Sequence, residues 1–161
     1  MDSRRIVILD TGPLWELVLY QAVTQLGFVS LRRNLTHFVS PEAYSNCGSF
    51  LAAFGQRVTS ASVVAELYRH IRKTEPRGHS QLWKQVYEEF ERMGMDEHVV
   101  KLLEMAPDLV TLYGPTDASL IEIAQRNIRQ TPVILTLDNR LHAECKRSQI
   151  RSDLLVQVCN R

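Results

Sequence analysis

The sequence Ile6-Val7-Ile8-Leu9-Asp10-Thr11-Gly12-Pro13 decides how the rest of the chain is interpreted. The residues before Asp10 are apolar without a break, which is typical of a strand buried on both faces at the centre of a parallel sheet. Gly12 and Pro13 end this strand and begin a helix, because proline suits the first turn of a helix. Asp10 is therefore expected at the carboxyl end of a central strand, where open α/β sheets bind ligands.

Further short apolar runs alternate with helical patterns along the chain. Besides the opening strand, strands are predicted at residues 56–60, 109–113, 133–137 and 154–158. Helices are predicted at residues 14–26, 41–54, 63–73, 81–93, 97–105, 117–129 and 139–147. This alternation favours a three-layer α/β/α architecture with a parallel sheet covered on both faces. The 161 residues are expected to form a single domain, 1–161, because they contain no repeat and no linker.

Composition and charge narrow the class of protein. A hydrophobic content of 45% argues against disorder, and a net charge of +1 gives no global signal for nucleic acid or membrane. No apolar run approaches the roughly 20 residues of a membrane helix, and the charged first residues argue against a signal peptide. The three cysteines lack C-x-x-C spacing, so we expect neither a disulfide framework nor a zinc knuckle, and we predict a cytoplasmic location.

Four acidic residues follow the predicted strands. Asp10 ends the first strand and Asp138 ends the fourth, while Glu66 lies about one turn into the helix after the second. Asp117 begins the helix after the predicted third strand. Right-handed crossovers bring these strand ends to one edge of a parallel sheet, so the four carboxylates are expected to share one crevice. Like charges this close need a counter-cation, and oxygen donors favour Mg²⁺ or Mn²⁺.

Each aspartate also has a simpler interpretation. An aspartate between a strand and a helix is a favoured N-cap, which accounts singly for Asp10, Asp117 and Asp138. Glu66 has no such role, and it stands among apolar residues, where an unpaired carboxylate is unfavourable. The sequence leaves both interpretations of the aspartates open.

Four segments resemble, in order, the motifs of the PIN-domain ribonucleases: ILDTGPL (8–14), VAEL (64–67), TDASLIEIA (116–124) and LTLDNRL (135–141). The resemblance spans the chain from residue 6 to about residue 158. It implies a PIN-like fold with a five-stranded parallel sheet in the order 3-2-1-4-5. It also implies metal-dependent endonuclease activity on single-stranded RNA, with Mg²⁺ or Mn²⁺ as the cofactor.

The resemblance further assigns roles to individual residues. It implies that the catalytic and metal-binding quartet consists of Asp10, Glu66, Asp117 and Asp138. Thr136 matches the family's small hydroxyl residue, which positions water or a neighbouring carboxylate, and Thr11 has the same kind of expected role. Many stand-alone members are VapC-type toxins of toxin–antitoxin pairs, so a homodimer and a small antitoxin-like protein are implied partners. Residues 30–55 and 79–105 make this chain longer than the compact toxins.

Affinity for RNA requires basic groups beside the carboxylates. Arg69 follows Glu66 by three residues on a predicted helix, and Arg140 follows Asp138 by two, so both are candidate substrate contacts. The five histidines share no metal-ligand spacing and are interpreted as surface or core residues. Trp15 and Trp83 are interpreted as core or interface residues rather than as base-stacking platforms, although a protein that binds RNA could use them to stack bases.

Other Mg²⁺-dependent modules are less compatible with the sequence. A phosphoacceptor receiver domain needs an acidic pair before its first helix, whereas Ile8 and Leu9 precede Asp10, and it needs a lysine after its last strand. Haloacid dehalogenase phosphatases need a second aspartate where Gly12 stands, and no dinucleotide-binding or P-loop motif occurs. A PIN-fold or receiver-like module that binds Mg²⁺ and acts through a protein partner, with little catalysis, remains the alternative to a ribonuclease.

Overall fold

The computed structural model describes residues 2–38 and 40–160, and the side chains of residues 5–38 and 40–160. The strands are Asp2–Leu9 (β1), Phe54–Ser60 (β2), Met95–His98 (β3), Val133–Thr136 (β4) and Arg151–Leu154 (β5). They form one sheet in the order β3-β2-β1-β4-β5, and every neighbouring pair is parallel. The predicted α/β class and the strand order 3-2-1-4-5 are therefore confirmed.

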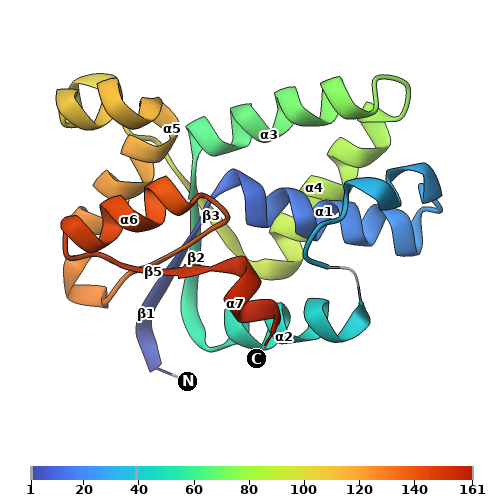
Figure 1. Cartoon of the computed structure of the whole chain (residues 1–161), viewed down its shortest axis with the longest axis horizontal. Coiled ribbons are helices and arrows are strands. Elements are labelled where there is room, and N and C mark those ends of the chain that lie inside the picture. Colours follow the sequence, from blue (N-terminus) through green and yellow to red (C-terminus); the bar gives the residue numbers. More distant parts are fainter. Residues whose placement is uncertain (1, 39, 161) are drawn as a thin grey trace.

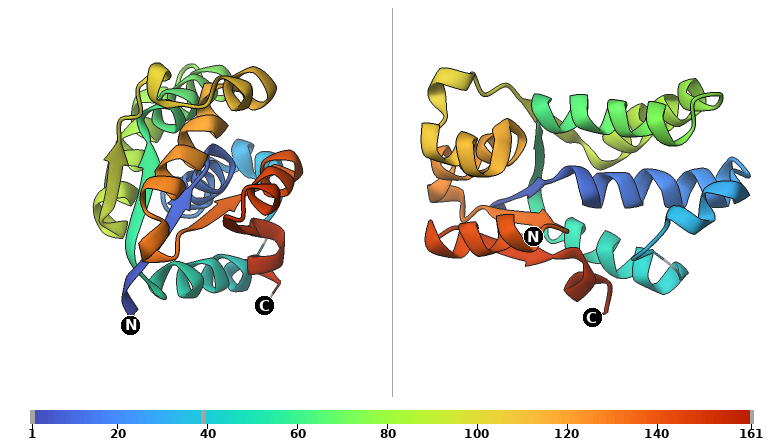
Figure 2. Two further views of the ribbon diagram at one scale, coloured as in Figure 1. Left: turned by 90° about the vertical axis from the view of Figure 1, so that its left-hand side faces the viewer. Right: turned by 45° about the horizontal axis from the view of Figure 1, so that its top comes forward.

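Helices cover both faces of this sheet. The α-helices are Thr11–Gln25 (α1), Pro41–Ala52 (α2), Ala61–Thr74 (α3), His79–Met93 (α4), Pro107–Arg126 (α5), Asn139–Arg147 (α6) and Leu155–Cys159 (α7). Short 3₁₀ helices cover Val29–Asn34 (η1), Leu102–Glu104 (η2) and Ile128–Gln130 (η3). Helices α5 and α6 lie on one side of the strands and α1, α2 and α4 on the other, whereas α3 extends from the end of β2 (Figures 1 and 2). This arrangement is the one that right-handed crossovers produce.

The core is built around β1. Its residue Ile8 is aligned with Val58 of β2 on one side and Ile134 of β4 on the other. All three side chains are buried, as are the other apolar residues of β1 from residue 6 onward. A side chain buried to this degree contributes about 1.5–3 kcal/mol relative to an exposed one. The unbroken apolar run therefore fixes β1 at the centre of the sheet.

The predicted third strand is wrong. Residues 109–113 form the first half of α5, which begins at Pro107, and the Thr111 hydroxyl donates to the Pro107 carbonyl at 2.9 Å. The third strand is β3, in a region where the pattern predicted a helix at 97–105. As an edge strand, β3 has exposed Asp96 and Glu97 in place of an apolar run, so its sequence lacks the usual signal.

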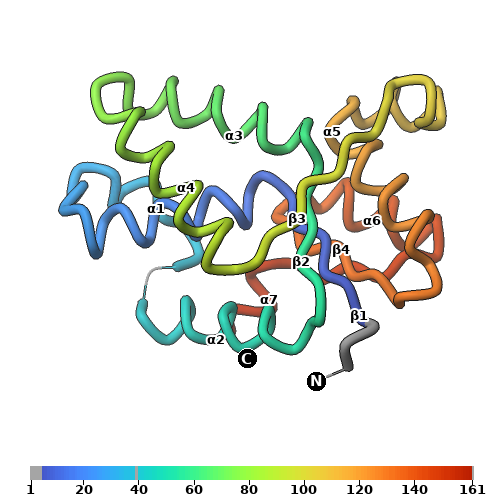
Figure 3. Tube along the Cα trace, turned by 180° about the vertical axis from the view of Figure 1, so that it is seen from behind, coloured from blue at the N-terminus to red at the C-terminus, as the bar shows by residue number. Residues whose placement is uncertain are grey.

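The predicted fifth strand is also displaced. Strand β5 ends at Leu154, and residues 155–159 form α7, which packs beside α2 near the C-terminal end of the chain (Figure 3). Asn46 of α2 donates its side-chain amide to the Cys159 carbonyl at 3.0 Å. The apolar residues Leu155 and Val158 are buried as helical residues rather than as strand residues. An apolar run this short is compatible with either structure.

Within the described residues, no helix is both long enough and apolar enough to cross a lipid bilayer.

The segment after α1 is fastened by Glu16, whose side chain is only 2% exposed. Its carboxylate accepts hydrogen bonds from the backbone N–H groups of Thr36 (2.9 Å), His37 (3.1 Å) and Phe38 (3.2 Å), and from the Thr36 hydroxyl. Burial by itself raises the pKa of Glu16, but these hydrogen bonds outweigh it and hold the pKa below its ordinary value. One carboxylate thus attaches the connection between η1 and α2 to α1.

Replacing Glu16 with glutamine tests this attachment. The amide keeps the shape but loses one acceptor oxygen and the charge, so we expect Glu16→Gln to lower the free energy of unfolding by about 1–3 kcal/mol. The contribution of Glu16 is complete above its ordinary pKa of 4.5, and is lost as pH falls through the lowered pKa of the folded state. Urea unfolding from pH 7 to pH 3 measures both effects. The exposed Glu88→Gln is the control, and an equal loss in both variants would contradict the assignment.

Candidate active site

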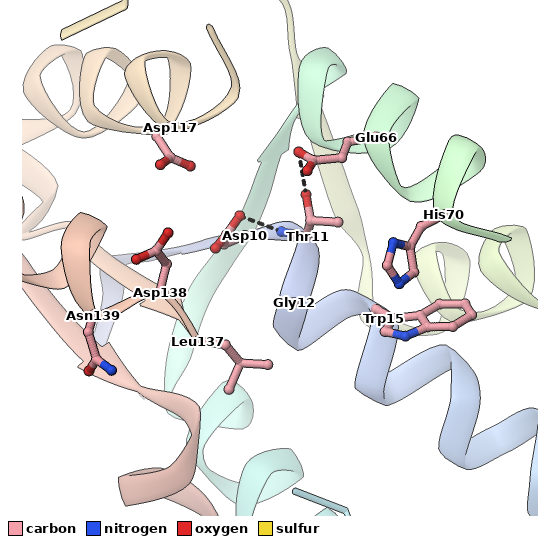
Figure 4. Close-up of a pocket in the computed structure, with 10 residues that line it drawn as sticks. All are labelled: Asp10, Thr11, Gly12, Trp15, Glu66, His70, Asp117, Leu137, Asp138 and Asn139. Carbon is pink, nitrogen blue, oxygen red and sulfur yellow. Dashed lines mark hydrogen bonds between the residues drawn. The ribbon is translucent and has the colours of Figure 1, made fainter. Parts of the chain in front are cut away.

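A pocket of about 550 Å³ opens at the carboxyl ends of the central strands (Figure 4). It is lined by Asp10, Thr11, Gly12, Trp15, Glu66, His70, Asp117, Leu137, Asp138 and Asn139. The four acidic residues in this set are the four that the sequence singles out. They come from the ends of β1 and β4 and from α3 and α5, and their side chains point into the shared space.

Asp10 is fixed at the end of β1. Its backbone N–H donates to the Leu135 carbonyl at 3.1 Å, which continues the pairing of β1 with β4. One carboxylate oxygen accepts from the Thr11 N–H at 2.6 Å and thereby caps α1. The other accepts from the Thr136 hydroxyl at 2.7 Å. Asp10 is therefore a helix cap and a pocket residue at once, so the two interpretations of it are compatible.

Thr136 connects two of the carboxylates. Besides donating to Asp10, its hydroxyl accepts a hydrogen bond from the backbone N–H of Asp138 at 2.9 Å. Asp138 uses Oδ1 to cap α6, accepting from the N–H groups of Arg140 (2.6 Å) and Leu141 (3.4 Å). Its Oδ2 has no hydrogen-bond partner among the described residues. One completely buried hydroxyl thus sets the relative position of Asp10 and Asp138.

Glu66 enters the pocket beside α1. The Thr11 hydroxyl donates to its Oε2 at 3.2 Å, so the first turn of α1 contacts the second turn of α3. Gly12 lets α1 approach the end of β4, because a Cβ at this position would lie 2.9 Å from Cδ1 of Leu137. The close approach of the two segments explains why a glycine follows Thr11.

Asp117 reaches the pocket from an interrupted helix. Gly114 has φ 86° and ψ 168°, outside the helical region, so α5 is divided into two segments and Asp117 lies in the first turn of the second. The Ser119 hydroxyl donates to the Ser60 hydroxyl at 2.7 Å, and Ser60 in turn caps α3. This contact attaches the second segment of α5 to the start of the helix that carries Glu66. The sequence predicts a helix beginning at Asp117, but not the helix that precedes it.

The pocket has an excess of negative charge. Within the described part of the chain, no lysine, arginine or histidine forms an ion pair with any of its four carboxylates. Burial raises the pKa of Asp117 to about 7, with further upward contributions from the other three carboxylates, while Arg140 lowers it. Burial also raises the pKa of Asp10, against the hydrogen bonds from Thr136 and Thr11. The site therefore favours the uptake of a proton or a cation.

The donor set suits a hard divalent cation. All four acidic side chains offer carboxylate oxygens, and one of them, Asp117, accepts no hydrogen bond from any described residue. Oxygen donors without a protein partner are the ligands that Mg²⁺ and Mn²⁺ prefer. Among the residues that the structure describes, however, no three or more acidic, histidine or cysteine side chains are arranged so that together they could hold a metal ion. The carboxylates surround a pocket rather than a single point.

The two predicted substrate contacts lie outside the lining of this pocket. Arg140 donates to the Leu112 carbonyl at 3.1 Å, and its guanidinium carbon lies 5.7 Å from the centre of the Tyr113 ring. It therefore stands at the rim on the α5 side, close enough to influence Asp117. Arg69 is exposed on α3, and the next residue, His70, faces the pocket instead.

Five lining residues were not predicted as site residues: Gly12, Trp15, His70, Leu137 and Asn139. A signal for two of them exists in the sequence. Trp15 follows Thr11 by four residues, and His70 follows Glu66 by four, so each lies on the same helical face as its predecessor. Asn139 directly follows Asp138, and nothing in the pattern distinguishes it from a surface residue at the start of α6.

Comparisons with known proteins give no family for this chain. No protein-family model matches it, and no curated protein matches it. Matching solved structures include one described as "A domain of a functionally unknown protein from Methanocaldococcus jannaschii DSM 2661". It is 13% identical, with 93% of this chain and 90% of that chain covered at a TM-score of 0.49. A likeness of this degree carries no functional argument.

Replacing Thr136 with valine tests its link between the two aspartates. The change keeps the shape but leaves an Asp10 oxygen and the Asp138 N–H without their partner. We expect Thr136→Val to raise the pKa of Asp10 further and to lower the free energy of unfolding by about 1–3 kcal/mol. Carboxyl ¹³C NMR titration and urea unfolding measure these effects.

Thr59→Val is the matched control for this variant. Thr59 is equally buried, but its hydroxyl donates to the Leu9 carbonyl at 2.8 Å rather than to a carboxylate. We expect it to lower stability without changing the titration of Asp10. An unchanged Asp10 titration in Thr136→Val would refute the assigned link.

Asp117→Asn tests the electrostatic character of the pocket. Because the pKa of Asp117 is about 7 in the folded chain and 3.8 in the reference state, the folded chain binds more protons between these values. Without divalent cations, the stability contributed by this group falls as pH rises from about 4 to about 7. We expect Asp117→Asn to be more stable than the native chain at pH 8 and no more stable at pH 4. Urea unfolding at both pH values measures this, with the exposed Asp96→Asn as the control.

Proposed function

We propose that the protein is a metal-dependent endoribonuclease that hydrolyses phosphodiester bonds of single-stranded or structured RNA. The observation that carries this proposal is the pocket itself. Four separate elements direct carboxylates into it, and no described basic side chain pairs with any of them. The assigned catalytic and metal-binding residues are Asp10, Glu66, Asp117 and Asp138.

A divalent cation is central to this proposal, because four carboxylates by themselves would repel a polyanionic substrate. The four carboxylates would hold Mg²⁺ or Mn²⁺. When bound, such an ion activates water as a nucleophile and offsets charge on the phosphate that is attacked. Mg²⁺ usually keeps several of its waters and is held by one or two carboxylates, so not all four carboxylates would need to contact one ion.

The residues of the chain have distinct parts in the proposed reaction. Thr136 and the Thr11 N–H hold the Asp10 carboxylate in place. The Thr11 hydroxyl orients Glu66 by the bond to its Oε2. Asp117, whose carboxylate accepts no hydrogen bond from the described residues, is available to orient the attacking water and to accept its proton.

The PIN-domain family is part of the proposal. The order of the four motifs, the strand order 3-2-1-4-5 and the meeting of the four carboxylates support it. The toxin role, a homodimer and a small antitoxin-like partner are further proposals. Exposed apolar side chains before and within α5 support a partner surface, above all Leu103, which is 97% exposed. A cytoplasmic location is likewise proposed, supported by three buried cysteines that form no disulfide.

Cleavage of labelled RNA tests the activity. We expect cutting in Mg²⁺ or Mn²⁺, loss of activity in EDTA, and a decrease of about a hundred-fold or more in Asp10→Asn and Asp138→Asn. Asparagine keeps the cap on α1 and α6, so the fold should persist in both variants. The exposed Asp96→Asn is the matched control and should retain full activity. Cleavage that survives EDTA and both pocket variants would refute the proposal and favour a module that binds a partner.

A further inference from the structure

The pocket has an aromatic wall next to its carboxylates. Trp15 of α1 and His70 of α3 both line it, with ring centroids 4.9 Å apart and an angle of 77° between the ring planes. Figure 4 shows the two rings beside each other, on the side of the pocket away from Asp117 and Asp138. The wall therefore borders the carboxylates on the α1–α3 side.

The position of this wall follows from the register of the two helices. Thr11 contacts Glu66, and four residues further along each helix Trp15 contacts His70. Four residues of an α-helix rise about 6 Å, which is of the order of the distance from a backbone phosphate to the base of its own nucleotide. A nucleotide whose phosphate lies at the carboxylates can thus place its base at the two rings.

The polar groups of the wall form no hydrogen bond with any described residue. Trp15 is 8% exposed, yet its indole N–H donates to no described residue, although a buried tryptophan usually finds an acceptor. Trp15 lines the pocket, and its indole nitrogen is not one of the fully enclosed, unpaired polar atoms among the described residues. His70 is exposed, and within the described chain its ring contacts Trp15 but accepts or donates no hydrogen bond. An exposed ring and a free donor together form a site for a flat heterocycle with an acceptor at its edge.

We propose that Trp15 and His70 bind the base of a nucleotide adjacent to the cleaved phosphodiester. The base stacks on His70 and accepts a hydrogen bond from the Trp15 indole. This inference rests on the proposed function and narrows its substrate class, because only an unpaired, unstacked base can enter such a site. The substrate is therefore single-stranded RNA, or a loop within structured RNA.

A packing contact between two helices is the competing explanation for the two rings. If they only join α1 to α3, removing His70 affects stability and leaves the response to individual bases unchanged. A base-binding role makes the effect of His70 depend on whether a base is present at one particular nucleotide. The experiment therefore compares normal RNA with RNA that lacks a single base.

The test measures binding of short fluorescein-labelled single-stranded RNAs to the Asp138→Asn chain by fluorescence anisotropy, in Mg²⁺. A set of RNAs carries one abasic ribose at successive positions. We expect one abasic position to weaken binding about ten-fold, and His70→Ala to weaken binding of the intact RNA about ten-fold. In His70→Ala, that abasic position should cause no further loss.

Conservative variants separate stacking from packing. His70→Phe keeps an aromatic face and should bind within about two-fold of the parent, whereas Trp15→Phe removes the indole donor together with part of the ring and should bind several-fold more weakly. His79→Ala, on a histidine outside the pocket, is the control. In a Trp83→Phe background, Trp15 is the remaining tryptophan, and its fluorescence should change when RNA binds. Urea unfolding should show that His70→Ala stays folded.

The outcomes separate this inference from the nuclease proposal. An unchanged affinity in His70→Ala, an undiminished response of that variant to the abasic position, or no RNA binding by the parent would overturn the base site. If the native chain cleaves RNA and either of the two His70→Ala results is obtained, the base site is refuted and the nuclease proposal remains. Base-dependent binding without cleavage by the native chain would overturn the nuclease proposal and leave the base site.

Discussion

The hydroxyl of Thr136 is the contact on which the arrangement of the pocket depends. Its single hydrogen is donated to Asp10 and a lone pair accepts the Asp138 N–H, so one small side chain positions two like-charged residues. Burial raises the pKa of Asp10, and the fold tolerates this carboxylate because donors from Thr136 and Thr11 act in the opposite direction. Asp117 receives no such donor, and its pKa rises to about 7. The two carboxylates thus differ in hydrogen bonding: Asp10 accepts from two donors, whereas Asp117 accepts from none of the described residues.

The central strands were predictable from the sequence because burial on both faces demands unbroken apolar runs. The same constraint does not act on the edges of the sheet: β3 contains exposed Asp96 and Glu97, and β5 begins with exposed Arg151. The mistaken edge strands left the predicted sheet order intact, since that order came from the family resemblance. The meeting of the carboxylates was expected from the strand ends and right-handed crossovers. Asp117 still reaches the pocket because Gly114 and Pro115 interrupt α5 just before it.

The parts of the site that were not predicted depend on contacts between distant segments. The pairing of Trp15 with His70 requires the register of α1 against α3, which no local pattern specifies, although the four-residue spacing after Thr11 and Glu66 places each ring on the right face. The buried Glu16 is similar. Nothing in its neighbourhood along the chain identifies three backbone donors that lie twenty residues or more away.

Electrostatics explains why an aromatic wall and an acidic pocket belong together in one proposed site. The chain has a net charge of +1, and the two basic residues considered as substrate contacts stand outside the pocket, so attraction to phosphates is weak in the absence of a cation. A bound divalent ion would supply attraction at one phosphate only. Stacking of a base supplies affinity that neither depends on charge nor requires a particular sequence. In the proposed site, the rings of Trp15 and His70 would therefore provide what the carboxylates cannot, contact with the substrate that does not oppose its negative charge.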